Sequence, residues 1–231
     1  MKYLGILVLM ICITSCLTNE KSKPMLKEIY IENSEVNLEE IHNGIEKITF
    51  KNNFRGIIPF SKLKNIESLK YLRSEGGGVR EFNGEGLKFI DTLLLSNNKM
   101  DIIINFESLS NLIYLDLSRN QIKSIEKSGV FTLKNLKHID LSYNYLKSVS
   151  FSEECNSIKW LSLRSNRLQK IDSSISFLTN IEYLDISDNL FESIPPEIYN
   201  LPNLKTLKIS DNLISKEEIL ILRKSENISV E

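Results

Sequence analysis

The side chains best suited to binding chemistry lie in the middle of this sequence, at positions that recur every 22 to 24 residues. They comprise four rings, three acids that each stand near a ring, two arginines and one further tyrosine. The set is Tyr114, His138, Trp160, Tyr183, Asp116, Asp140, Asp185, Arg119, Arg164 and Tyr143. Aromatic rings and arginines concentrate binding energy in protein interfaces. We therefore treat these ten residues as candidate ligand-binding residues.

No catalytic set accompanies these residues. The sequence has two histidines, His42 and His138, which are too few and too far apart for a zinc site. No nucleophile with a base, and no pair of acids in a cleft, can be identified. The three glycines at 76–78 lack the spacing of a phosphate loop, so a loosened coil or an outer loop is the preferred interpretation. We expect no cofactor, no metal and no enzymatic activity.

The elements that would position the candidate residues are copies of one eleven-residue pattern, clearest in LIYLDLSRNQI at 112–122. It reads LxxLxLxxNxL and returns 24 residues later. Within LxL the side chains alternate as on a strand, so the leucines enter a core and the residues between them face outwards. The asparagine carries an acceptor and a donor, which suits a buried turn whose backbone groups have no ladder partner.

This pattern resembles the leucine-rich repeat. The resemblance implies an α/β solenoid, a horseshoe with about nine short parallel strands on the concave face, short turns or 3-10 pieces on the convex face, and a C-terminal cap helix. The third coil is degenerate, and we interpret it as Ile66, Leu69 and Tyr71 followed by Ser74 in the asparagine position. From the first coil to the ninth, that position holds Ser34, Asn53, Ser74, Asn98, Asn120, Asn144, Asn166, Asn189 and Asn212.

The repeat domain is expected to span residues 26–214, with a C-terminal cap at 215–231. Pro195 and Pro196 disfavour a long helix on the convex side. Ser215 and Glu218 have the spacing of a capping box, which predicts a helix start, with Ile219 and Leu220 among its apolar residues. The helix would cover the core that the last coil otherwise exposes.

Stacked coils place equivalent residues beside each other, about 4.8 Å apart. In this alignment the column of rings contains Ser68 in the third coil, and the column of acids contains Lys70. Two interpretations of the rings stay open, because aromatic residues pack well across strands and because contiguous exposed rings mark interaction sites. Asp116 and Asp140 would be neighbours, so arginines or a ligand, a cation included, should offset their repulsion.

The first residues have the form of an export signal. Residues 1–15 begin with one positive charge at Lys2 and continue with a ten-residue apolar run, too short to span a membrane. Ile13-Thr14-Ser15-Cys16 resembles the lipobox of bacterial lipoproteins, which implies cleavage before Cys16 and lipidation of that cysteine. Residues 16–25 would be the lipidated tether. An ordinary signal peptide that contains a cysteine is the alternative.

Composition narrows the function further. Charged residues form 26% and hydrophobic residues 42% of the chain, which excludes extensive disorder. The net charge of −1 shows no excess of basic residues for binding nucleic acid.

We expect a membrane-anchored leucine-rich repeat binding protein of the bacterial cell envelope, at the outer membrane or cell surface rather than the inner membrane. Its concave face would recognise a protein of the host or the envelope, or a glycan. The alternatives are a periplasmic accessory or inhibitor subunit of an enzyme complex, and a purely structural envelope protein.

Overall fold

The computed structural model describes residues 27–31, 41, 44–50, 60–63, 66–223 and 228–231. The predicted signal peptide, the tether with Cys16, and His42 lie outside the described residues. Within the described part, no helix has the length and apolar character needed to cross a membrane.

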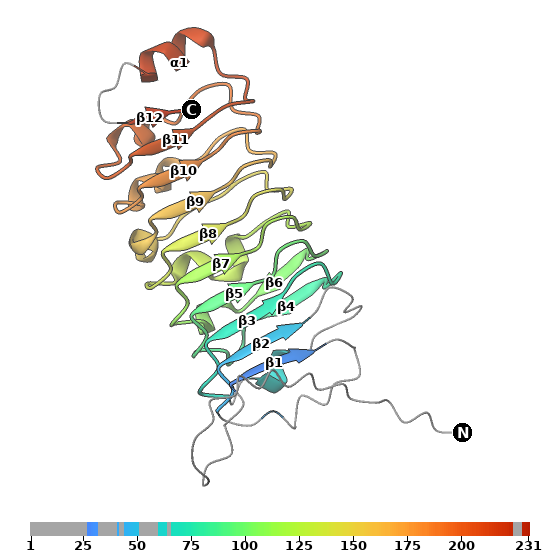
Figure 1. The fold of residues 1–231 in the computed structure, drawn as a ribbon. Helices are drawn as coiled ribbons and strands as arrows, with labels where there is room; N and C mark the ends of the chain where they lie inside the picture. Colours follow the sequence, from blue (N-terminus) through green and yellow to red (C-terminus); the bar gives the residue numbers. More distant parts are fainter. Residues whose placement is uncertain (1–26, 32–40, 42–43, 51–59, 64–65, 224–227) are drawn as a thin grey trace, which may run out of the picture.

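The described strands form a long parallel sheet of ten strands in the order β1-β2-β3-β5-β7-β8-β9-β10-β11-β12. Successive strands lie one above the next along the molecule (Figure 1). The strands are β1 Glu28–Ile31, β2 Lys47–Phe50, β3 Tyr71–Ser74, β5 Thr92–Leu94, β7 Tyr114–Asp116, β8 His138–Asp140, β9 Trp160–Ser162, β10 Tyr183–Asp185, β11 Thr206–Lys208 and β12 Ser229–Val230. The predicted α/β solenoid is confirmed, and the tenth strand, β12, extends the sheet past the ninth coil.

The opposite side of most described coils carries short 3-10 helices, as predicted. They are η2 Phe60–Leu63, η3 Phe106–Ser108, η4 Glu126–Ser128, η5 Val130–Thr132, η6 Glu153–Ser157, η7 Ser173–Phe177 and η8 Pro196–Asn200. Ser152 and Asp172 cap η6 and η7, since their side chains accept hydrogen bonds from the backbone N–H groups of Glu154 and Ser174. Pro196 is tolerated in η8 because it occupies the first turn, where no helical N–H bond is lost.

A second, two-stranded parallel sheet was not predicted. It pairs β4 (Glu81–Asn83) with β6 (Ile102–Ile104). Phe82 and Ile103 at the centres of these strands are buried, while their neighbours are exposed or half-buried. The alternation matches a strand with one face on the core.

The core is one continuous cluster of aliphatic and aromatic side chains between the sheet and the 3-10 side. In the N-terminal coils it contains a chain of phenylalanines. The ring centroids of Phe60 and Phe82 lie 4.7 Å apart, and those of Phe82 and Phe106 lie 5.1 Å apart. Such edge-to-face and tilted contacts add to the free energy that area burial alone provides.

The predicted alignment of the third coil is wrong by three residues. Leu72 pairs with Ile48 of β2 and Leu93 of β5, so it takes the first leucine position of the strand. Ser74 therefore occupies the second leucine position, where it is 1% exposed, and Gly77 takes the asparagine position. The error arose because a serine stands where the other coils have an aliphatic or aromatic residue.

The correction changes both columns. With the corrected alignment, the third coil contributes Tyr71 and not Ser68 to the ring column, and Arg73 and not Lys70 to the acid column. Ser68 instead closes the preceding turn, since its hydroxyl accepts from the N–H of Gly44 at 2.8 Å and donates to the carbonyl of Ile45 at 2.7 Å.

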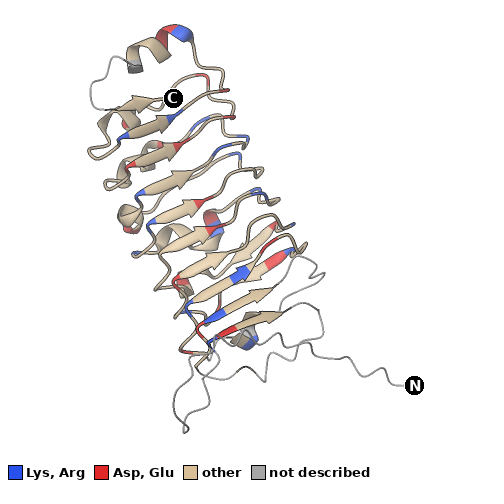
Figure 2. Cartoon of the chain, in the orientation of Figure 1, with Lys and Arg blue, Asp and Glu red and all other residues tan. Residues whose placement is uncertain are grey.

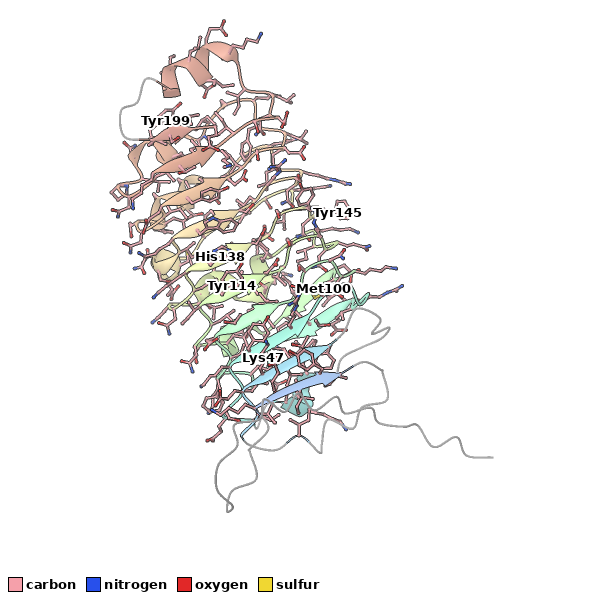
Figure 3. The ribbon with its side chains drawn as sticks, in the orientation of Figure 1. Lys47, Met100, Tyr114, His138, Tyr145 and Tyr199 are labelled. Carbon is pink, nitrogen blue, oxygen red and sulfur yellow. The ribbon has the colours of Figure 1, made fainter. Side chains whose placement is uncertain are left out.

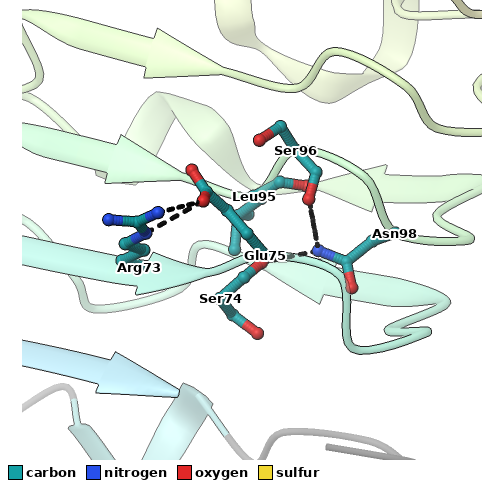
Figure 4. Close-up of polar contacts among 6 residues, drawn as sticks. All are labelled: Arg73, Ser74, Glu75, Leu95, Ser96 and Asn98. Carbon is teal, nitrogen blue, oxygen red and sulfur yellow. Dashed lines mark hydrogen bonds and ion pairs between the residues drawn. The ribbon is translucent and has the colours of Figure 1, made fainter. Parts of the chain in front are cut away.

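The repeat asparagines join adjacent coils through the backbone. The Asn98 amide donates to the carbonyls of Ser74, Leu95 and Ser96, at 2.6, 3.0 and 3.2 Å (Figure 4). Its Oδ1 accepts from the N–H groups of Gly77 and Val79, both at 3.1 Å. Equivalent bonds recur at the later repeat asparagines. These side chains satisfy the turn groups that the sheet leaves unpaired.

In the seven coils from the third to the ninth, the residue before the asparagine position has a left-handed backbone, whereas the corresponding residues before Ser34 and Asn53 lie outside the described residues. The φ angles lie between 53° and 69°, at Gly76, Asn97, Arg119, Tyr143, Ser165, Asp188 and Asp211. Most of these are not glycine, so each turn carries some strain that the asparagine bonds offset.

The C-terminal end is closed by the predicted helix, α1 (Lys216–Arg223), and by β12. The Ser215 hydroxyl accepts from the N–H of Glu218 at 3.2 Å, as expected of an N-cap. The capping box is only half formed, because the Glu218 carboxylate accepts from the N–H of Ile194 in the preceding coil. Ile219 packs against the core, whereas Leu220 is 57% exposed and does not contribute to the buried face.

Candidate ligand-binding surface

The four predicted rings form one continuous stack. Tyr114, His138, Trp160 and Tyr183 are the first residues of β7 to β10, and the strand register sets them side by side. Successive centroids are 4.1, 3.9 and 5.0 Å apart, and the ring planes differ by 9° or less. Tyr114 and His138 follow one another on neighbouring strands in Figure 3. We call these four residues the ring stack.

Each ring covers its neighbour's face, so the stack presents ring edges to solvent. The leucine or isoleucine that follows each ring enters the core, which leaves the ring on the outer face of the sheet. Tyr114 is 36% exposed, and the other three rings are half-buried. The rings pack across strands and also form a contiguous accessible surface, so both interpretations from the sequence stay open.

The stack is uncharged at neutral pH. Burial lowers the pKa of His138 to about 4, against a smaller opposing effect of the Asp116 carboxylate. Burial also raises the pKa of the Tyr114 and Tyr183 hydroxyls. The surface therefore combines apolar ring edges with neutral hydrogen-bonding groups.

The three predicted acids lie in the adjacent column and end their strands. Asp116 and Asp140 accept hydrogen bonds from the N–H groups two residues later, at 2.9 and 2.8 Å. Asp185 does the same with Ser187, through both the N–H group at 3.0 Å and the hydroxyl at 2.5 Å. Asp185 is 5% exposed, so its side chain is buried beneath the surface and offers a ligand little contact area.

The repulsion within this column is only partly offset. Burial raises the pKa of Asp140, and the carboxylates of Asp116 and Asp185 add to the rise, while hydrogen bonds from Ser142 oppose it. No ion pair in the described part of the chain joins these acids to an arginine or lysine. The arginines considered from the sequence do not compensate them.

The remaining three predicted residues lie outside the strands. Arg119, Tyr143 and Arg164 lie in the turns that follow the strands, and the Arg119 guanidinium carbon is 4.2 Å from the centroid of the Tyr143 ring. Arg164 is exposed, and its carbonyl accepts from the N–H of Tyr143 at 2.8 Å. The ten predicted residues are thus divided between the strands and the turns.

Sequence reasoning missed two residues near these surfaces. Tyr71 is a further ring in the same column, separated from Tyr114 by Thr92, and the Lys47 ammonium lies 4.7 Å from its centroid. Tyr145 lies in the same turn as Tyr143, beneath the Arg167 guanidinium at 4.6 Å. The correct register would have revealed Tyr71, and the alternation of Tyr143 and Tyr145 about Asn144 was a signal for the second.

Neither a metal site nor a reactive thiol is seen among the described residues. They contain no group of three histidine, cysteine or acidic side chains that could hold a metal ion. Cys155 is fully buried, and burial raises the pKa of its thiol to about 12. A thiol with so high a pKa is a poor nucleophile.

The match to a family model agrees with this fold. The leucine rich repeat profile matches residues 92–146, 115–168 and 156–214, which together span more than half of the 231 residues. Among solved structures, a leucine-rich repeat protein of Leptospira interrogans is similar, with 21% identity and a TM-score of 0.48 over 84% of this chain. This chain spans 62% of the length of that protein. No curated protein matches. The recurring motif, the parallel coils and the matched profile show that the chain belongs to the leucine-rich repeat family.

Proposed function

We propose that the protein is a membrane-anchored binding protein of the bacterial cell envelope, and that its ring stack recognises a protein ligand. A leucine-rich repeat solenoid presents an extended sheet face on which partners dock. The observation that carries the proposal is the uninterrupted stack of four rings on the outer face of β7 to β10. Fold alone does not name a ligand, so the proposal rests on this surface.

The stack has the physical properties of an interface centre. Its rings are already fixed by one another, so little side-chain entropy remains to be lost on binding. The rings combine large apolar area with polar groups at their edges, as recurs at binding hot spots. A protein partner can insert side chains between the ring edges and the neighbouring strand ends.

The experiment compares a ring of the stack, the half-buried Trp160, with an exposed ring outside it, Tyr199. The purified protein is used to capture partners from envelope extract and from host extracellular proteins, and the Kd of each partner is then measured. Trp160→Ala should weaken binding by about 2 kcal/mol or more, since binding energy concentrates at central aromatic residues. Tyr199→Ala is the matched control, because Tyr199 is 41% exposed on η8, away from the stack.

The outcomes separate the proposal from its alternatives. Loss of binding with Trp160→Ala but not with Tyr199→Ala supports the ring stack as the site. Unchanged binding in both variants, with thermal stability retained, places the site elsewhere. Unfolding of Trp160→Ala would make the ring a packing residue, as in a purely structural protein. Recovery of an enzyme whose activity changes on binding would favour the accessory or inhibitor subunit.

The membrane anchor is the second part of the proposal and rests on the sequence ITSC at 13–16. Mass spectrometry of the mature N-terminus should find acylated Cys16 as the first residue. Cys16→Ala should give an unprocessed or soluble form, because stable anchoring needs more than one acyl chain. An unmodified N-terminus at another residue would end this part of the proposal without affecting the ring stack.

A further inference from the structure

A second charged surface lies along the turns that follow β7, β8 and β9. Residues 117–124, 141–148 and 163–170 occupy equivalent places in three successive coils and contain no acid. They contain six exposed basic residues, which we call the basic edge: Arg119, Lys123, Lys147, Arg164, Arg167 and Lys170. Figure 2 shows blue segments in the turns beyond the strand ends in the middle of the stack. The whole chain has a net charge of −1, so the excess of positive charge in these turns is a local feature.

The three segments of the basic edge contain no acid, although the carboxylates of Glu126 and Asp188 accept hydrogen bonds from Ser148 and Ser165 within them. Within the described part of the chain, the ion pairs involve other lysines and arginines, such as Lys159 with Glu182 and Arg73 with Glu75. Lys170 lies near Asp172 and contributes to lowering the pKa of that carboxyl. The other five cations are exposed and form no ion pair in the described part of the chain. An anionic ligand would meet them without first displacing an ion pair.

Two tyrosines hold two of the arginines in place. Arg119 lies over Tyr143, and Arg167 lies over Tyr145, with the guanidinium carbon 4.2 and 4.6 Å from the ring centroid. Cation–π contacts of this kind restrict the guanidinium without using its hydrogen-bond donors. Tyr143 and Tyr145 stay 38% and 39% exposed. The edge therefore offers oriented guanidinium groups beside accessible aromatic surface (Figure 3).

Acids bound the basic edge on both sides. The equivalent turns after β10 and β11 carry Asp188, Glu192 and Asp211, and the turn after β5 carries Asp101. Three coils at about 4.8 Å per strand make a basic window of roughly 10 Å. A flat anionic membrane or a long nucleic acid lying along the edge would also meet these acids. A narrow anionic chain that crosses the edge would avoid them.

We propose that the basic edge binds an acidic polysaccharide, a chain that carries sulfate or carboxylate groups. Arginine forks donate two parallel hydrogen bonds to such groups. Sugar rings also present C–H faces, which pack on exposed tyrosine surface, whereas an acidic peptide backbone lacks them. This site lies at the ends of the strands, apart from the ring stack on their faces, and it does not depend on the function proposed above.

The test measures binding of size-defined heparin oligosaccharides and of polygalacturonate to the purified protein by calorimetry. The edge variant combines Arg119→Gln, Lys147→Gln and Arg167→Gln. The matched control combines Lys127→Gln, Lys134→Gln and Lys137→Gln, which makes the same change of charge at exposed residues before β8. Removing three exposed charge contacts should weaken binding at least about tenfold, and the control should stay near the parent. Melting temperatures verify that both variants fold.

Four results would overturn the proposal. Equal losses in the edge and control variants would show that only net charge matters. Binding of single-stranded DNA or of anionic lipid vesicles as tight as that of the oligosaccharides would show general polyanion or membrane affinity. Absence of binding to either polysaccharide would remove the ligand class. Trp160→Ala should bind the oligosaccharides as tightly as the parent. Weaker binding by this variant would show that the oligosaccharides bind at the ring stack and not at the basic edge.

Discussion

Replacement of Asn144 by alanine tests the physical basis of the coils. Asn144 is 4% exposed, and its amide donates to the carbonyls of Leu117, Leu141 and Ser142 while its Oδ1 accepts from the N–H of Ile122. In Asn144→Ala the three carbonyls keep another donor each. These donors are the amide of Asn120, the amide of Asn166 and the N–H of Arg119.

The N–H of Ile122 is then the buried group that loses its partner. One buried unsatisfied donor costs about 1–3 kcal/mol, so the free energy of unfolding should fall by that amount. Asn212→Ala should cost less, because Asn212 is half-buried in the last repeat coil and water can replace its bonds. Asn180→Ala is the control, since the exposed Asn180 amide donates to one carbonyl, that of Asn156.

Urea unfolding followed by circular dichroism measures these differences. A repeat protein can depart from two-state unfolding, so midpoints and slopes are compared together. The reasoning predicts that Asn144→Ala is the least stable, followed by Asn212→Ala and Asn180→Ala. If Asn144→Ala matches Asn180→Ala, the asparagine bonds do not carry the turns and the explanation given for the repeat is refuted.

Two further predictions concern single residues. The pKa of His138 is lowered to about 4 from an ordinary value of 6.5, so the unfolded chain binds the extra proton first and stability falls as the pH drops from 6.5 towards 4. Thermal melts of the parent and of His138→Phe are compared at pH 7 and pH 4.5. The melting temperature should fall less in the variant between these two pH values, and equal falls would contradict the buried neutral ring. Ser74 has a buried hydroxyl without a hydrogen-bond partner, so Ser74→Ala should raise the free energy of unfolding by about 1 kcal/mol in urea melts. A decrease would show that the hydroxyl is satisfied.

The fold was largely predictable because the leucine positions of the repeat mark the residues that are buried in the core. From β5 to β11 the predicted leucine positions coincide with the strands and their core residues. The prediction failed in the third coil, where Ser74 takes a leucine position and Gly77 an asparagine position. A pattern based on residue type cannot find a coil in which both markers are replaced. The pair β4 and β6 was missed for a related reason, since it lies outside the repeated LxL segment.

The candidate site was predictable only where the strand register determines it. Alternation along a strand places Tyr114 and His138 on the same outer face, so the ring stack follows from spacing. The turns follow no such rule. Arg119 and Tyr143 have a left-handed backbone, which their residue types do not indicate because neither is glycine. Its recurrence at the residue before the repeat asparagines became visible only in the structure. The separation of the basic edge from the ring stack therefore required the structure.

The most direct test of the central claim uses the fluorescence of Trp160, the single tryptophan of the chain. Its ring lies between His138 and Tyr183 in the middle of the stack. A captured partner is titrated into the purified protein while tryptophan emission and its quenching by acrylamide are recorded, with a tryptophan-free partner or fragment. The account predicts a shift of the emission and protection from acrylamide that saturate at the independently measured Kd. Unchanged emission and quenching at full occupancy would show that the partner binds elsewhere and would contradict the ring stack as the ligand surface.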